Sequence, residues 1–215
     1  MKERPILFSA PMVRAILEGR KTQTRRIIKA KNMVIRGDDG IWYDADCIRP
    51  GIPLKCPYGQ PGDRLWLKET WKPDPAWGHP QKTKPTDIEE GTNILYRATL
   101  PEDHPKASWM NWRPAIFMRR WMSRITLEVT GVRVERLQEI SEADAISEGI
   151  NTNRSMGVFY HQGTLATPYA REQFGIPADA PFGPCAWYAG LWESINGPGS
   201  WDANPWVWVL NFKVL

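Results

Sequence analysis

The sequence contains few of the residues that usually hold metals or form disulfides. It has three cysteines in 215 residues, and no two of them form a CxxC pair. An odd number of unevenly spaced cysteines argues against a disulfide framework, a zinc site and a redox motif. The three histidines, His79, His104 and His161, are isolated, so neither a Ser-His-Asp triad nor a zinc-ligand pattern is visible. We therefore expect no metal and no cofactor.

Long apolar segments are missing as well. No stretch approaches the roughly 20 consecutive apolar residues that a membrane-spanning helix needs. The opening Met-Lys-Glu-Arg-Pro leads into no apolar run of the kind found in a signal peptide. Together with the cysteine usage, this predicts a cytoplasmic protein without a membrane partner.

Basic residues are in slight excess and are clustered. The net charge is +4 and the pI is near 9.0, which indicates nucleic acid only where positive charges gather. Residues 19–36 hold seven basic side chains and no acidic one, and residues 106–124 form a second acid-free basic run containing Trp109, Trp112 and Trp121. Such runs are usually solvated faces, but basic and aromatic residues together also suit phosphates and stacked bases.

The stretch Pro11–Arg26 predicts a short helix that runs directly into a polar strand. Pro11 suits the first turn of a helix over residues 10–18, and Gly19 suits its end. The apolar period then changes to two, which predicts a strand over residues 22–28. Thr22, Thr24 and Arg26 should share one face of that strand, with Lys21 reaching in from the turn. Three polar side chains in a row can form a pocket wall, although a plain solvated face is more common.

Further elements alternate with loop-rich segments. We expect strands at residues 4–9 and 94–99, a turn followed by a strand over residues 62–71, a hairpin over residues 33–42, and a last strand at residues 206–214. Between them lie segments rich in proline, glycine, tryptophan or charge, which we interpret as insertions into a single domain spanning residues 1–215. These insertions cover residues 30–61, 72–114 and 151–181.

The second half of the chain indicates the fold class. Apolar residues alternate from Ile125 to Val129 and then shift phase by one at Gly131, as in a β-bulge that bends a strand and helps to close a small barrel. Ser141 and Asp144 resemble a capping box at the start of a helix that Gly149 ends, and another helix is predicted over residues 187–195. The pattern indicates an α+β fold with a small β-barrel and about three short flanking helices.

Three motifs in order resemble the ASCH domain family, whose members are PUA-like barrels proposed to bind RNA. Residues 19–26, Gly-Arg-Lys-Thr-Gln-Thr-Arg-Arg, resemble the family signature Gly-x-Lys-x-x-Thr-x-Arg. Residues 62–65 are similar to the following turn and strand, and residues 140–150 to a helix with a glutamate near its end. The insertions and the Trp-Glu-Ser-Ile-Asn-Gly block resemble versions carried by phages and prophages. The resemblance implies a bacterial host, and RNA or a modified nucleoside as the partner.

One enzyme class in this family hydrolyses the acetamide of N4-acetylcytidine with a lysine, a threonine and a glutamate. Lys21 and Thr24 match the lysine and threonine of the signature, and Glu148 matches the helical glutamate. The resemblance therefore implies an amidohydrolase that acts on an N-acylated cytidine-like nucleoside. The enzyme class is about half as long as this chain, so the added segments could widen, cover or fill the pocket.

Such a trio can perform amide hydrolysis in two ways. A threonine hydroxyl needs a base, and a lysine can serve when burial lowers its pKa from about 10.4 towards roughly 7 to 8. Glu148 would then orient Lys21 or pass protons to the leaving amine, although a nearby carboxylate also raises the lysine pKa. Alternatively, Lys21 stays charged and stabilises the oxyanion while Glu148 activates water. The sequence favours neither.

Binding without catalysis is the main alternative. In it, the same pocket recognises RNA or a modified nucleotide, and Glu148 is a plain ion-pair partner of Lys21. Arg26 could equally pair with Asp63 or Glu69. An RNA-cleaving enzyme has less support because no histidine pair is present. A Lys21 buried beside Glu148 would favour catalysis, whereas an exposed Lys21 would favour binding. The expected substrate-binding residues are Arg26, Thr22, Trp71 and Arg124, and we expect a monomer.

Overall fold

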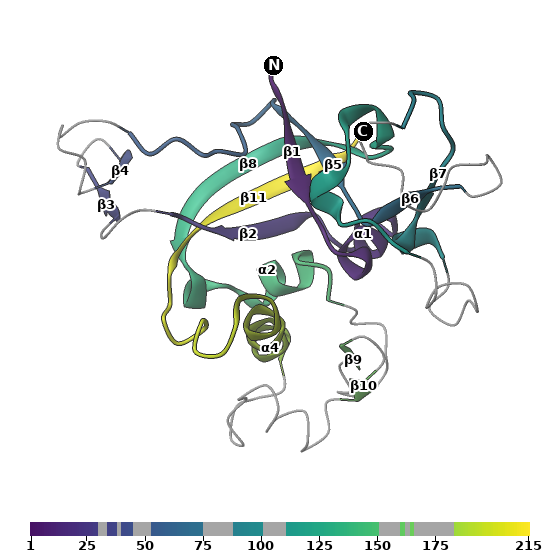
Figure 1. The fold of residues 1–215 in the computed structure, drawn as a ribbon. Coiled ribbons are helices and arrows are strands. Elements are labelled where there is room, and N and C mark those ends of the chain that lie inside the picture. The colour runs from purple at the N-terminus through teal and green to yellow at the C-terminus, as the bar shows by residue number, and fades with distance from the viewer. Residues whose placement is uncertain are drawn as a thin grey trace.

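A curved five-stranded sheet forms the centre of the molecule in a computed structural model (Figure 1). The structure describes residues 1–29, 34–37, 40–44, 53–74, 88–100, 111–150, 160–161, 164–165 and 183–215. The strand order is β1-β5-β8-β11-β2, with β1 parallel to β5 and every other neighbouring pair antiparallel. The strands are β1 (Glu3–Leu7), β5 (Arg64–Lys68), β8 (Thr126–Arg136), β11 (Trp206–Val214) and β2 (Gln23–Ile27).

The predicted β-bulge lies in β8, opposite β11. Asn211 pairs with Gly131, whereas Phe212 pairs with Val129, so Thr130 is an additional residue in β8. An extra residue of this kind increases the local bend and twist of a strand. Both long strands curve strongly in Figure 1, and the rest of the sheet follows them.

The mixed sheet and flanking helices confirm the α+β class, but the expected closed barrel is not confirmed. In the described residues, the sheet has β1 at one edge and β2 at the other, and these two strands do not pair. A side chain joins the edges instead, because Arg26 Nη2 donates a hydrogen bond to the Leu7 carbonyl at 2.7 Å. The curved sheet is therefore open, with one side-chain bond between its edge strands.

Three α-helices flank the sheet within the described part of the chain: α1 (Ala10–Leu17), α2 (Glu142–Ser147) and α4 (Pro184–Asn196). The first joins β1 to the turn before β2, as the sequence predicts. The second begins at Ser141, whose hydroxyl accepts the Asp144 backbone N–H at 3.1 Å, and this bond satisfies one of the unpaired donors of the first turn. No helix among these residues has the length and apolar character that crossing a membrane requires.

Two apolar cores lie on the two faces of the sheet. Because side chains alternate along a strand, neighbouring residues of β11 serve different cores: Leu210 faces α1 and Val209 faces α2 and α4. The first core comprises mainly Ile6, Phe8, Val13, Ile16, Leu65, Leu67, Leu127, Val129, Leu210 and Phe212. The second comprises Leu137, Ile140, Ala145, Ile150, Tyr188, Trp192, Val207 and Val209. The candidate site lies at the sheet edge between these cores.

Short strand pairs and 3-10 turns complete the described residues. The predicted hairpin is present as β3 (Val34–Arg36) paired with β4 (Trp42–Asp44), and β6 (Trp71–Pro73) pairs with β7 (Ile94–Tyr96). The remaining elements are β9 (Tyr160–His161), β10 (Thr164–Leu165), and the turns Arg97–Thr99, Ala115–Phe117, Arg120–Met122 and Leu137–Glu139. Most of the predicted insertions 72–114 and 151–181 lies outside the described residues, whereas more than half of the insertion 30–61 lies within them.

Candidate functional site

The end of α1 places Lys21 on the inside of the protein. Gly19 has a φ of +73°, a left-handed conformation that glycine adopts without the penalty of a side chain. This turn lets the backbone N–H groups of Arg20 and Lys21 both donate to the Ala15 carbonyl, at 2.9 and 3.0 Å. The chain therefore reverses within three residues, and the Lys21 side chain points back towards the end of α2.

Lys21 and Glu148 form a buried ion pair. The Lys21 Nζ donates to Glu148 Oε2 at 2.5 Å, to the Glu148 carbonyl at 2.9 Å and to the Gln23 carbonyl at 2.8 Å. The side chains of the pair are 0% and 3% exposed. The three acceptors of Lys21 Nζ match the three hydrogens of a charged ammonium. Nearby, the Thr22 backbone N–H donates to the Ser147 carbonyl at 2.9 Å, and this bond connects the segment after α1 to the end of α2.

Gly149 leaves room for this arrangement. It follows the end of α2 with a φ of +100°, and a Cβ atom at this position would lie 2.9 Å from the Lys21 Cβ and 3.0 Å from the Ala15 Cβ. Both distances are far shorter than carbon–carbon contacts in proteins. The glycine that the sequence marks as a helix end is therefore also where the lysine segment packs closely.

Opposing effects act on Lys21. Burial lowers the pKa of Lys21, whereas the Glu148 carboxylate raises it, and burial is the larger effect. The positive charges of Arg26 and Arg25 also lower the Lys21 pKa. Burial penalises the charged amine, so the free-energy difference between the charged and the neutral form of Lys21 is smaller in this site than in water.

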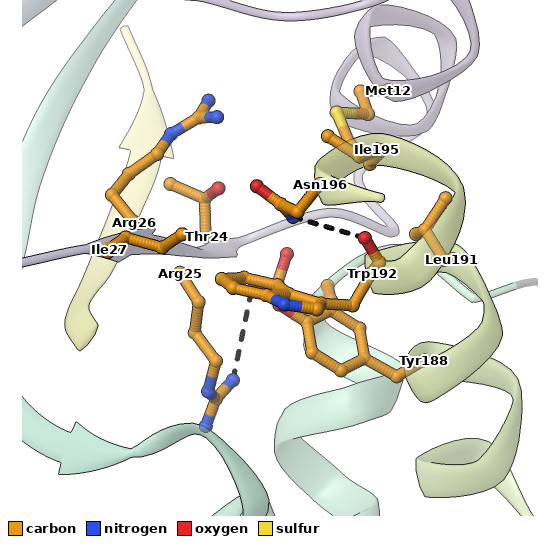
Figure 2. A pocket seen from close by; sticks show the side chains of 11 residues that line it. Met12, Thr24, Arg25, Arg26, Ile27, Tyr188, Leu191, Trp192, Ile195 and Asn196 are labelled. Carbon is orange, nitrogen blue, oxygen red and sulfur yellow. Dashed lines mark hydrogen bonds and ion pairs between the residues drawn. The ribbon is translucent and has the colours of Figure 1, made fainter. Parts of the chain in front are cut away.

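A cavity of about 70 Å³ opens beside the pair, at the edge of the sheet (Figure 2). Thr24 and Glu148, 3% and 5% exposed, both line it. Helix α4 forms the facing wall, and Figure 2 shows the Thr24 hydroxyl on the side of the cavity that faces Asn196. The complete lining is Met12, Thr24, Arg25, Arg26, Ile27, Glu148, Tyr188, Leu191, Trp192, Ile195 and Asn196.

The register of β2 against β11 explains how Thr24 and Arg25 are presented. Thr24 lies opposite Leu210 and Arg25 opposite Val209. Opposed residues of neighbouring strands share a face of the sheet, so Thr24 faces the first core and Arg25 the second. Because β2 is at the edge of the described sheet, residues on both of its faces line the cavity.

Arg25 is a site residue that the sequence analysis missed. Its side chain is 0% exposed and pairs with Asp144 at 3.0 Å and with Glu135 at 3.2 Å. It also donates to the Gln23 side-chain oxygen, and its Nη1 lies 3.8 Å from Glu148 Oε1. A row of basic residues in the sequence gives no sign that one of them is buried among carboxylates.

The α4 wall was also missed, although a sequence signal for it exists. Tyr188, Leu191, Trp192, Ile195 and Asn196 follow the i, i+3, i+4, i+7, i+8 spacing of one helix face. The sequence pattern predicts this helix, but our sequence analysis assigns none of these residues to the site. Only the fold reveals that this face is turned towards Thr24.

Arg26 lines the cavity, as expected of a substrate-binding residue. Its guanidinium lies over the Phe8 ring at 5.1 Å and donates to the Leu7 carbonyl. The alternative ion pairs are wrong, because Asp63 pairs with Arg4 at 2.8 Å and Glu69 pairs with Arg124. Among the described residues, no carboxylate lies within ion-pair distance of Arg26.

The other three expected substrate-binding residues lie away from the cavity. Thr22 precedes β2 and is exposed, so it does not continue the Thr24–Arg26 face. Trp71 is 0% exposed and packs with Met118 and Met122, which leaves no ring face for stacking on a substrate. Arg124 pairs with Glu69 at 2.9 Å. The stacking and binding roles predicted for these residues are not supported by their positions.

The remaining candidates of the second basic run belong to the same distant region. Trp121 packs against the Trp71 cluster, and Trp112 lies 6.0 Å from the Arg97 guanidinium. Trp109 and Lys106 lie outside the described residues. Within the described ranges, no group of three or more His, Cys, Asp or Glu side chains is arranged to hold a metal ion.

Comparisons with known proteins add one structural alignment. No protein-family model and no curated protein matches the sequence. A crystal structure of an ASCH domain from Lactobacillus crispatus JV V101 aligns with 99% of this chain and 79% of that chain, with a TM-score of 0.37 and 11% sequence identity. Values this low do not establish a family, so ASCH membership stays a prediction from the sequence motifs.

Proposed function

We propose that the cavity is the active site of an amidohydrolase for an N-acylated cytidine-like nucleoside, in a single ASCH-type domain. The observation that supports it most directly is the buried Lys21–Glu148 pair beside Thr24, since Glu148 and Thr24 line one cavity. A buried lysine beside a carboxylate favours catalysis over simple binding. The nucleoside itself is inferred from the motif resemblance.

The pair can supply both proton transfers that amide hydrolysis requires. In a low-dielectric site, Lys21 can pass a proton along the 2.5 Å contact to Glu148, which leaves a neutral amine and a neutral acid. Thr24 Oγ then attacks the acyl carbon while its proton passes to Lys21. The carbon–nitrogen bond breaks as Glu148 protonates the leaving amine, which restores the ion pair.

The second half of the reaction reverses these transfers. Water attacks the acyl–Thr24 ester, and its proton passes to Glu148. Lys21 returns a proton to Thr24 Oγ as the acid leaves, so the neutral pair is ready for another cycle. The Gln23 carbonyl holds the Lys21 amine next to the peptide that precedes Thr24. In the competing mechanism, Lys21 stays charged and Glu148 activates water directly.

Turnover of N4-acetylcytidine, followed by chromatographic detection of cytidine, tests this proposal. Thr24→Ala should abolish turnover by the nucleophilic mechanism, and Glu148→Gln should lower kcat roughly a hundredfold or more. Thr130→Ala, at the exposed bulge of β8, is a matched control that should keep wild-type activity. A wild-type protein that releases no cytidine would rule out this substrate, and an active Thr24→Ala variant would favour the water mechanism.

A binding module for RNA or a modified nucleotide is the second candidate. The observation in its favour is that Lys21 already donates three hydrogen bonds, which is the pattern of a structural ammonium. In this case the cavity holds N4-acetylcytidine without converting it, and Arg26 supplies the charge for RNA. Calorimetric titration of the protein with RNA at two salt concentrations tests this. The affinity for RNA should fall as the salt concentration rises, and Arg26→Ala should reduce it.

A further inference from the structure

The two oxygens of Glu148 have different partners. Oε2 receives the Lys21 ammonium at 2.5 Å. Oε1 receives the Tyr188 hydroxyl at 3.4 Å and has Arg25 Nη1 at 3.8 Å. Tyr188 belongs to α4, forty residues beyond Glu148 in the chain, so the carboxylate is held from both walls of the cavity.

Tyr188 has little freedom to move. It is 4% exposed, and its ring packs against Trp192 and Trp201 at centroid distances of 6.2 and 6.3 Å. The Arg25 guanidinium lies 5.9 Å from the same ring. Burial, followed by the Glu148 charge, raises the pKa of Tyr188 well above its usual value. The phenol therefore keeps its proton and remains a hydrogen-bond donor.

We propose that Tyr188 is a positioning residue that determines which oxygen of Glu148 carries the mobile proton. A phenol that donates to Oε1 stabilises negative charge on that oxygen, so an added proton is favoured on Oε2, next to Lys21. This is the oxygen through which the pair exchanges its proton in the hydrolysis scheme. The catalytic consequence rests on the proposed function, whereas the hydrogen bond itself does not.

Tyr188→Phe removes the donor and keeps the ring, and Tyr96→Phe is its matched control. The Tyr96 hydroxyl donates to the Met122 carbonyl at 2.8 Å, in a cluster that does not line the cavity. We expect Tyr188→Phe to lower kcat about tenfold, the value of one hydrogen bond, with KM changed less than about twofold. Tyr96→Phe should leave both constants unchanged. A general loosening of the cavity wall would raise KM instead and would contradict the proposal.

A measurement that needs no turnover separates this inference from the proposed function. Carbon-13 NMR of glutamate-labelled protein at neutral pH observes the Glu148 carboxyl directly, and the Glu148→Gln variant assigns its signal. We expect this signal to move in Tyr188→Phe and to stay in place in Tyr96→Phe, because only the first variant loses a hydrogen-bond donor to that carboxylate. A signal that stays in place in Tyr188→Phe overturns the inference, whereas a moved signal in a protein without any turnover overturns only the hydrolase proposal.

Discussion

Replacing Gly149 by alanine tests the packing on which the site depends. The new Cβ would lie 2.9 Å from the Lys21 Cβ and 3.0 Å from the Ala15 Cβ. Neither neighbour is the flexible end of a long side chain, so relief requires the backbone after α1 or α2 to shift. Such a shift would separate the Lys21 ammonium from Glu148, and stability and activity should therefore fall together.

Gly91 provides a control for the backbone conformation. Its φ of +96° is close to the +100° of Gly149, but a Cβ at Gly91 would meet no atom within 4 Å. A left-handed conformation costs a residue with a side chain about 1–2 kcal/mol, and overpacking costs about 1–3 kcal/mol more. Gly149→Ala should therefore lose roughly 2–5 kcal/mol, and Gly91→Ala about 1–2 kcal/mol. Effects on the unfolded chain are similar in both variants and cancel in the difference.

Urea unfolding followed by tryptophan fluorescence measures both losses in the same assay. For a chain of this size, each kcal/mol corresponds to about 2–4 °C in Tm, so thermal unfolding gives an independent check. N4-acetylcytidine turnover of the same two variants should show a loss only for Gly149→Ala. Equal losses of stability in the two variants would refute the reasoning, because the contact with Lys21 would then contribute nothing.

Other expectations concern ion pairs and pH. Lys21→Met leaves Glu148 buried without its cation and should lower the free energy of unfolding in urea by about 3–5 kcal/mol. Adding Glu148→Gln should recover part of this loss, and purely additive losses in the double variant would contradict the expectation. Glu69→Gln disrupts the pair with Arg124 and should cost about 1–3 kcal/mol without reducing turnover; a large loss of kcat would give that region a role in the site. Hydrogen bonds from the Lys2 backbone and Arg4 lower the Asp63 pKa to about 2. The stability that this carboxylate contributes is present above its unfolded pKa of about 3.9 and should be lost as pH falls towards 2. Thermal unfolding of Asp63→Asn should lack this loss, and a pH profile identical to that of the wild type would refute it.

Elements fixed by local chemistry could be predicted from the sequence. The helix start at Ser141 depends on a hydroxyl and a backbone N–H three residues apart, and the structure shows that bond. The phase shift at Gly131 likewise corresponds to a real change of register. Barrel closure could not be predicted in the same way, because it depends on whether β1 and β2, which are separated by a helix, approach closely enough to pair.

The sequence motifs predicted only the part of the candidate site that the β2 segment and the end of α2 supply. Lys21 and Glu148 come together as the motifs indicate, but the spacing of polar residues placed Thr22 on the cavity wall, whereas it precedes the strand and is exposed. Trp71 illustrates the opposite error, because the sequence analysis names it as a ring that could bind a substrate and this ring is completely buried. The α4 wall depends on tertiary packing that no local pattern specifies.

The pairing of β2 with β11 has a consequence for how the protein is made. The ribosome releases residues 21–27 long before residues 184–214, and at about 5–20 residues per second the delay is roughly 10–40 s. Throughout that interval β2 lacks β11, its neighbour in the described sheet, and Thr24 has no facing helix. The proposed site of a nascent chain is therefore incomplete until β11 has been synthesised.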